Sequence, residues 1–148
     1  MRVLFVCLGN ICRSPTAEAV FRVACPEIAC DSAGTGDWHL GNPPYGPMQA
    51  AAKARGVDMA DLLARQFDAA DFARFDLFVA MDSDNAREIE MLRPVGNRTP
   101  VRLLASYAGD ESDCVPDPYF TRDFDETLEI VQAAIGGLVA DLRGGRST

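Results

Sequence analysis

One segment near the start of the chain combines residue types that could bind and attack a phosphoryl group. Cys7 and Arg13 are separated by five residues within the run CLGNICRSP, which occupies positions 7–15. A tight loop that leads from a strand into a helix can direct successive backbone N–H groups inward, and the helix dipole adds partial positive charge. We therefore expect an anion-binding loop here, in which Gly9 and Asn10 are the residues best able to adopt left-handed backbone angles.

The side chains of this loop have complementary chemistry. Arg13 offers a planar fork of donors that matches two phosphoryl oxygens and keeps its charge. The same positive surroundings favour the thiolate of Cys7, which is the nucleophilic form of a cysteine. The hydroxyl of Ser14 can donate a hydrogen bond to that sulfur. An anion site with a thiolate at its floor favours in-line attack on phosphorus.

Each of these residues also has an ordinary structural interpretation. A single cysteine at the end of a strand is usually a small buried hydrophobic residue, and an arginine near a helix start is usually solvated. Glycine-containing turns between a strand and a helix also occur in proteins that only bind nucleotide or flavin phosphates. The combination of cysteine, arginine, hydroxyl and proline at one junction favours catalysis. The alternative is a non-enzymatic phosphate-binding module in which Cys7 is inert.

Cleavage of a phosphate ester also needs an acid to protonate the departing oxygen, and a thiolate cannot supply that proton. Asp117 is the best candidate, because it follows the last expected strand and precedes Pro118, which stiffens the loop. An Asp-Pro pair alone is more often an ordinary turn. Four other aspartates near expected loops or helix starts are expected to cap helices or face water: Asp82, Asp113, Asp123 and Asp125.

Two aromatic residues are candidates for the walls of a substrate pocket. Trp38, the only tryptophan, lies in a loop rich in glycine and proline, and it could face Tyr119 and sandwich a substrate ring. A tryptophan that simply covers the loop is an equally good interpretation. His39, the only histidine, is assigned no catalytic role.

Short apolar runs that alternate with helical patterns must position these residues. Strands are expected at residues 2–7, 28–31, 77–81 and 101–104. Helices are expected from Ser14 as N-cap with Pro15 as first helical residue, over 48–55, after Asp82 or Ser83, and over 124–142. This alternation predicts a three-layer α/β fold with a short parallel sheet, whose ligand site lies beyond the carboxyl ends of the strands.

Length and composition place further bounds on the protein. A chain of 148 residues with 48% hydrophobic residues is expected to form one domain, residues 1–148, with a disordered tail at 144–148. A net charge of -8 argues against nucleic acid and anionic membranes as partners. The sequence has no long apolar span, and the polar loop reached by Gly9 argues against export through a standard signal peptide. Five cysteines without a CxxC pair indicate the reducing cytoplasm and no zinc site.

Five motifs resemble the low-molecular-weight protein tyrosine phosphatases, in the same order and over nearly the whole chain. They are CLGNICRSP at 7–15, SAGT at 32–35 followed by Trp38-His39, ARQ at 64–66, Met81-Asp82 with Asn85, and DPY at 117–119. The resemblance implies a flavodoxin-like fold with a four-stranded parallel sheet and hydrolysis of phosphotyrosine in proteins or of small aryl phosphates. It implies a phosphocysteine intermediate on Cys7, phosphate binding by Arg13, and Asp117 as general acid and then as base, with no metal and no cofactor.

The resemblance also assigns supporting residues by position. Asn10 would shape the phosphate loop, Ser14 would stabilise the thiolate, and Ser32 would support the loop from beneath. Cys12 would form a reversible disulfide with oxidised Cys7. The residues expected to bind substrate are Leu8, Gly9, Asn10, Ile11, Cys12, Ser14, Trp38 and Tyr119.

Two positions depart from the family pattern. Leu62 stands where many members carry a histidine that supports the loop asparagine, so the group that braces Asn10 is left open. Phe120 replaces the second tyrosine of the usual DPYY motif, which removes one possible phosphorylation site.

Two related enzyme classes share this fold and loop. Thioredoxin-coupled arsenate reductases need two further cysteines after the third strand, and none lies between Met81 and Pro100. Protein arginine phosphatases tend to have threonine at the position of Ile11 and phenylalanine at that of Tyr119. Ile11 should crowd a guanidinium group but tolerate a flat phenol ring, which favours phosphotyrosine. The sequence makes no prediction of the oligomeric state.

Overall fold

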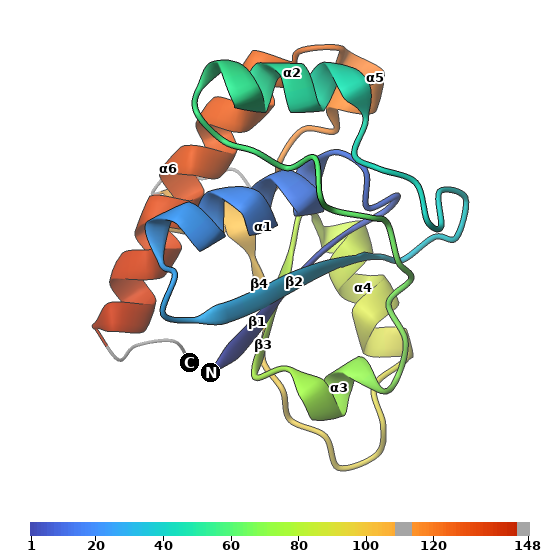
Figure 1. The fold of residues 1–148 in the computed structure, drawn as a ribbon. Helices are drawn as coiled ribbons and strands as arrows, with labels where there is room; N and C mark the ends of the chain where they lie inside the picture. Colours follow the sequence, from blue (N-terminus) through green and yellow to red (C-terminus); the bar gives the residue numbers. More distant parts are fainter. Residues whose placement is uncertain (109–113, 145–148) are drawn as a thin grey trace.

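A computed structural model describes residues 1–108 and 114–144, in which four parallel strands form one sheet (Figure 1). The strands are β1 (Arg2–Cys7), β2 (Ala29–Gly34), β3 (Leu77–Ala80) and β4 (Val101–Leu103). Their order in the sheet is β2-β1-β3-β4, which is the flavodoxin-like order. The predicted fold class is therefore confirmed.

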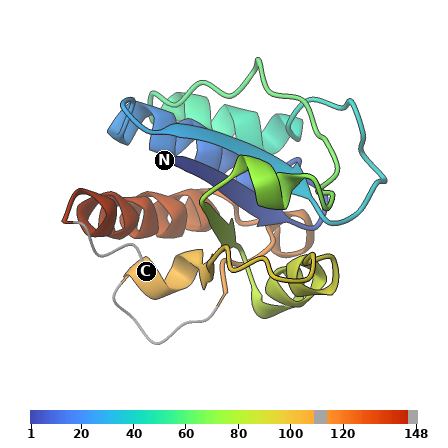
Figure 2. The same cartoon turned by 90° about the horizontal axis from the view of Figure 1, so that it is seen from below.

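Helices cover both faces of this sheet and give three layers (Figure 2). The core on one face includes residues of α1 (Arg13–Ala24), α2 (Gly46–Ala54) and α6 (Phe124–Arg143). The core on the other face includes residues of α3 (Asp71–Arg74) and α4 (Ser83–Met91). Two short elements, the 3₁₀ helix η1 (Leu104–Ala108) and α5 (Pro118–Thr121), complete the described part of the chain.

The nearly continuous apolar run of β1 reflects burial on both faces of the sheet. Val3 and Phe5 pack in the core beneath α1 and α6, whereas Leu4 and Val6 pack in the opposite core. All four side chains are fully buried, and β1 pairs with β2 on one side and with β3 on the other. A strand in this position needs apolar side chains at every residue, which is why the run predicts it well.

The second strand was only partly predicted. β2 starts at Ala29 and continues to Gly34, whereas the expected strand covers residues 28–31. Ser32 and Ala33 are buried and pair in register with the last part of β1. Small and polar residues give little local strand signal, and the pairing with β1 decides their conformation.

The start of the first helix also differs from the expectation. α1 begins at Arg13, and the residue at its N-cap is Cys12, which makes no side-chain capping bond. Ser14 lies inside the first turn, and its hydroxyl binds loop atoms instead of capping the helix. Pro15 is accommodated because N–H groups in the first turn have no partner within the helix.

The remaining elements differ by a few residues from the expected ranges. α2 starts at Gly46, two residues before the expected start, and β3 ends at Ala80, one residue before the expected end. β4 also ends one residue early, at Leu103, because Leu104 belongs to η1. The side chain of Asp82 caps α4, which confirms one of the two expected caps. The elements α3, η1 and α5 are too short to give a periodic pattern, and they were not predicted.

Residues 145–148 of the expected tail lie outside the described residues, and Gly144 is the C-cap of α6. No helix in residues 1–108 or 114–144 is long and apolar enough to cross a membrane.

Candidate active site

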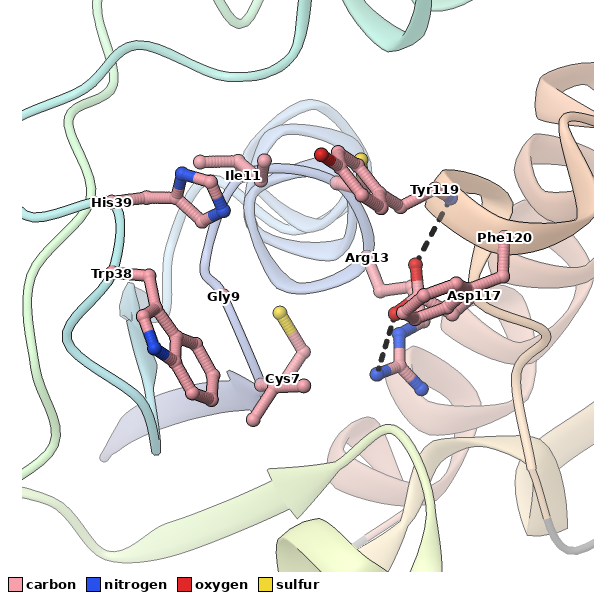
Figure 3. Close-up of a pocket in the computed structure, with 11 residues that line it drawn as sticks. Cys7, Gly9, Ile11, Arg13, Trp38, His39, Asp117, Tyr119 and Phe120 are labelled. Atoms are coloured by element: carbon pink, nitrogen blue, oxygen red, sulfur yellow. Dashed lines mark hydrogen bonds and ion pairs between the residues drawn. The ribbon is translucent and has the colours of Figure 1, made fainter.

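A pocket of about 240 Å³ opens at the carboxyl end of β1 (Figure 3). Three segments form it: the loop between β1 and α1, the loop after β2, and the start of α5. Its lining consists of Cys7, Leu8, Gly9, Ile11, Cys12, Arg13, Trp38, His39, Asp117, Tyr119 and Phe120. The expected nucleophile, phosphate-binding arginine, acid and aromatic residues are thus brought to one place. His39 and Phe120 also line the pocket, and neither was expected to bind substrate.

The two aromatic candidates lie on opposite sides of this pocket, with Cys7 between them (Figure 3). Trp38 is 70% exposed, and Tyr119 is 43% exposed. The ring of Tyr119 also lies against that of Tyr45, with centroids 5.4 Å apart. The exposed indole and the phenol therefore border the pocket that contains the sulfur atom.

The loop between β1 and α1 has one residue in the left-handed region. Asn10 has a φ of 57°, as expected, and asparagine is among the residues that adopt this conformation at least cost. Gly9 does not have a positive φ, so of the two residues best able to adopt left-handed angles only Asn10 does so. A Cβ atom at Gly9 would lie 3.1 Å from Cδ2 of His39, so close approach of the histidine ring explains the glycine.

The sulfur of Cys7 is only slightly exposed and has two polar neighbours. Its Sγ lies 3.0 Å from Oγ of Ser14, and it accepts a hydrogen bond of 3.2 Å from the backbone N–H of Asn10. Hydrogen bonds that are donated to a sulfur atom favour its negatively charged form.

The side-chain amide of Asn10 determines the direction of these bonds. Its Oδ1 accepts from the backbone N–H of Arg65 at 2.9 Å, and this contact fixes the orientation of the amide. Its Nδ2 donates to Oγ of Ser14 at 2.8 Å and to Oγ of Ser32 at 3.0 Å. Because Ser14 accepts from Asn10, its own proton is available for the sulfur of Cys7. A backbone group therefore braces Asn10, and the departure at Leu62 is resolved.

Glu18 completes this network, and its part in it was not predicted. Its Oε1 accepts from Oγ of Ser32 at 2.7 Å, and its Oε2 accepts from Arg22 at 2.8 Å. Burial raises the pKa of Glu18, although the bonds from Ser32 and Arg22 oppose that shift. The sequence contains a signal for this role, since Ser14, Glu18 and Arg22 recur at intervals of four residues on one helix face.

Glu18 sets the donor direction of the network because a carboxylate can only accept. The hydroxyl of Ser32 donates to Glu18 and so accepts from Asn10, whose second N–H then reaches Ser14. The chain of hydrogen bonds runs from the buried carboxylate to the sulfur of Cys7, with each proton assigned.

We expect Glu18→Gln to slow the alkylation of Cys7 at neutral pH. A neutral amide accepts more weakly, and its own N–H competes as a donor to Ser32. The rate of alkylation should fall about 2- to 10-fold, the worth of one net hydrogen bond. Glu27→Gln, at an exposed carboxylate that binds Arg143, is the control and should leave the rate unchanged. A rate in Glu18→Gln identical to that of the wild type would contradict this role.

Arg13 is buried and held by three groups. Its Nη1 donates to Oδ2 of Asp82 at 2.8 Å and to the carbonyl of Val115 at 3.1 Å, and its Nη2 lies 3.5 Å from Oδ2 of Asp117. Burial alone would lower the pKa of Arg13, but the negative charges of Cys7, Asp82 and Asp117 outweigh it and raise the pKa. Asp82 was expected only to cap a helix, and its contact with Arg13 was missed.

The carboxylate of Asp117 lies between Arg13 and the first turn of α5. Its Oδ1 accepts from the backbone N–H of Tyr119 at 3.1 Å, and its side chain is 24% exposed. Of the other four aspartates, Asp82 and Asp123 cap helices and Asp125 is exposed, as expected. Asp113 lies outside the described residues.

Cys12 lines the same pocket but has a different environment from Cys7. Burial, together with the nearby negative charges of Cys7 and Asp117, raises the pKa of Cys12 to about 12. Cys12 is therefore a protonated thiol at neutral pH.

Comparisons with known proteins agree with this geometry. Residues 2–147 match the sequence model of the family described as low molecular weight phosphotyrosine protein phosphatase. The low molecular weight protein-tyrosine-phosphatase YfkJ of Bacillus subtilis is 38% identical over 148 residues, which cover 95% of each chain. The crystal structure of YfkJ superposes with a TM-score of 0.92 over 99% of this chain and 96% of that one.

Two further relatives differ in the activity that their names state. A low molecular weight protein-tyrosine-phosphatase of Streptomyces coelicolor is 46% identical, and the match covers 96% of this chain and 93% of the relative. A Drosophila arginine phosphatase is 32% identical, with a TM-score of 0.90 over 97% of this chain and 98% of that one. The match to the family model over nearly the whole chain shows that this protein belongs to the low molecular weight phosphotyrosine protein phosphatases and is a protein-tyrosine phosphatase by class.

Proposed function

We propose that the chain hydrolyses phosphotyrosine in two steps, through a phosphocysteine intermediate on Cys7. The observation that carries this proposal is the position of the buried Cys7 sulfur in the same pocket as the guanidinium of Arg13 and the carboxylate of Asp117. A nucleophile, an anion-binding group and an acid are what cleavage of a phosphate ester requires. The alternative, a phosphate-binding module in which Cys7 is inert, gives no reason for a carboxylate in the pocket or for hydrogen bonds to the sulfur.

In the first step, Arg13 and the loop N–H groups hold the phosphoryl oxygens, and the Cys7 thiolate attacks phosphorus opposite the ester oxygen. The S–P bond forms while the P–O bond breaks, and protonated Asp117 gives its proton to the departing phenol. In the second step, the resulting carboxylate of Asp117 takes a proton from water, whose oxygen attacks phosphorus. Inorganic phosphate leaves, and the thiolate of Cys7 and the protonated acid are restored.

The substrate preference of this mechanism should depend on the aromatic walls of the pocket. Trp38 and Tyr119 can contact a phenol ring, and the short side chain of phosphoserine cannot bring its phosphorus to Cys7. We expect kcat/KM for a phosphotyrosine peptide to exceed that for the matched phosphoserine peptide by at least about 100-fold, since a group misplaced by 1 Å can cost that much. Equal values would remove the preference for tyrosine and leave the phosphatase chemistry intact.

Phosphoarginine is the second candidate substrate, because an arginine phosphatase is among the similar structures. Ile11 lines the pocket and is 7% exposed, and its branched side chain should crowd a guanidinium group. Inclusion of a phosphoarginine peptide in the same comparison tests this point. A higher kcat/KM for phosphoarginine than for phosphotyrosine would assign the enzyme to the other class.

Mild peroxide should inactivate the enzyme reversibly through a disulfide between Cys7 and Cys12. Oxidation converts Cys7 to a sulfenic acid, and the thiol of Cys12 displaces its hydroxyl as water to form the disulfide. Because the pKa of Cys12 is raised to about 12, the fraction of attacking thiolate and the rate of closure should increase with pH. The measurement is activity regained with thiol after peroxide. Cys12→Ser should regain little, and full recovery by that variant would contradict a protective role.

We further propose that residues 1–148 form one catalytic domain that works in the cytoplasm. The family model spans nearly all of these residues, which supports a single unit. A reducing compartment would keep Cys7 available as the nucleophile.

A further inference from the structure

A second pocket, of about 610 Å³, lies next to the proposed catalytic pocket. The two pockets share five lining residues, Leu8, Arg13, Trp38, Asp117 and Phe120. An occupant of the second pocket would therefore lie directly beside a phosphotyrosine bound over Cys7. The far side of this pocket is formed by residues of α4 and its cap.

This far side is rich in carboxylates. Asp82 binds Arg13 and caps α4, and Asp84 is paired with Arg87, so the charges of both aspartates are partly compensated. Glu88 also lines the pocket and makes no hydrogen bond or ion pair with any residue that the structure describes. An acidic wall with an uncompensated carboxylate favours a positively charged occupant.

Asn85 provides an independent indication of a ligand. It lines the same pocket and is 97% buried, since its relative exposure is 3%. Its Oδ1 is the buried side-chain oxygen that lacks a hydrogen-bond partner among residues 1–108 and 114–144. A buried acceptor without a partner costs about 1–3 kcal/mol. Because Asn85 is one of the residues that line the second pocket, an occupant with N–H donors is the kind of ligand that would supply the missing hydrogen bond after a small movement of this side chain.

We propose that this second pocket binds the cationic side chain of an arginine or lysine that neighbours the phosphotyrosine in the substrate protein. This inference rests on the proposed function. An arginine fork supplies several N–H donors, which match a carboxylate and an amide oxygen together. A metal ion fits less well, because no group of three potential ligands with suitable geometry occurs among the described residues.

The overall charge of the protein adds a reason for such a contact. A chain with a net charge of -8 repels an anionic phosphopeptide at long range, and a basic residue beside the phosphotyrosine reduces that repulsion. The carboxylates of the second pocket lie on one side of the catalytic pocket. A basic residue should therefore be favoured only at those positions of the peptide that can reach this side.

The test uses phosphotyrosine peptides whose other side chains are uncharged, and it compares those that carry arginine at position −2, −1, +1 or +2 with the same peptides that carry citrulline there. Citrulline keeps the shape of arginine and removes its charge. At one position or more, arginine should raise kcat/KM about 3- to 10-fold, which is the range expected of a partly exposed charged hydrogen bond, and added salt should reduce this ratio. Ratios near one at all four positions would overturn the proposal.

Two substitutions, Glu88→Gln and Glu90→Gln, test whether the preference for arginine arises in the second pocket. Both residues lie on α4 and both substitutions remove one negative charge, but Glu90 does not line the second pocket. Glu88→Gln should bring the arginine-to-citrulline ratio toward one, whereas Glu90→Gln should retain it. Retention of the ratio by Glu88→Gln, or an equal loss in Glu90→Gln, would overturn the assignment. Failure to hydrolyse any of the phosphotyrosine peptides would instead contradict the proposed function.

Discussion

Cys7→Ser should bind phosphate or vanadate and keep its fold, yet lose turnover of phosphotyrosine peptides by several orders of magnitude. The serine oxygen would occupy a site that already has donors from Ser14 and the backbone N–H of Asn10, so the loop should stay intact. A serine hydroxyl is not ionised where a thiolate is, and the covalent route is closed. The measurements are kcat, the melting temperature and the affinity for the anion.

Cys30→Ser is the matched control, because Cys30 is partly buried and lies outside the catalytic pocket. It should retain full activity. Residual turnover above about one per cent of the wild type in Cys7→Ser would contradict the assignment of the nucleophile. Loss of a catalytic nucleophile lowers kcat by several orders of magnitude.

Asp117→Asn should slow hydrolysis of phosphotyrosine by about 10²- to 10⁴-fold, the usual worth of a positioned general acid. A substrate with a more acidic phenol needs less help, so its rate of cysteine phosphorylation should fall much less. The dependence of that step on the pKa of the leaving group should become steeper, because charge on the departing oxygen is no longer neutralised. Single-turnover rates on a series of substituted phenyl phosphates measure this slope.

Two other aspartates separate acid catalysis from loss of structure or phosphate binding. Asp82→Asn removes the carboxylate that binds Arg13, so it should lower activity without a change in the slope. Asp123→Ala removes the side chain that caps α6 and should change stability more than chemistry. An unchanged slope in Asp117→Asn, or a steeper one in either control, would assign the acid to another residue.

The residues that line the site could largely be predicted, because the cysteine loop is a local motif. The segment from Cys7 to Arg13 adjoins a strand with a strong apolar signal, and the loop conformation depends on near neighbours. The pairing of this loop with Asp117 was inferred from the rule that parallel strands end at one edge of the sheet. The structure places both in one pocket.

The contacts that organise the loop could not be predicted in the same way, because they are long-range. Arg13 meets Asp82 across 69 positions, and the backbone N–H of Arg65 meets Asn10 across 55 positions. The residue type at a position does not reveal a hydrogen bond that its backbone N–H donates. The leucine at position 62 therefore suggested that Asn10 lacks a supporting group, although the backbone N–H of Arg65 supports it. Two expectations were attached to Ser14, a helix cap and a hydrogen bond to the sulfur of Cys7, and the structure shows only the second, together with an unexpected bond from Asn10.

The position of β1 between β2 and β3 has a consequence for how a newly made chain acquires activity. β1 is synthesised first, but its partners follow about 30 and 75 residues later, and Asp117 later still. Pairing across such separations is delayed, because the entropy of loop closure opposes it. A nascent chain therefore carries Cys7 without the groups that surround it in the fold. We therefore expect catalytic activity to appear late in folding, so that turnover recovered during refolding reports the assembled sheet rather than the first helices to form.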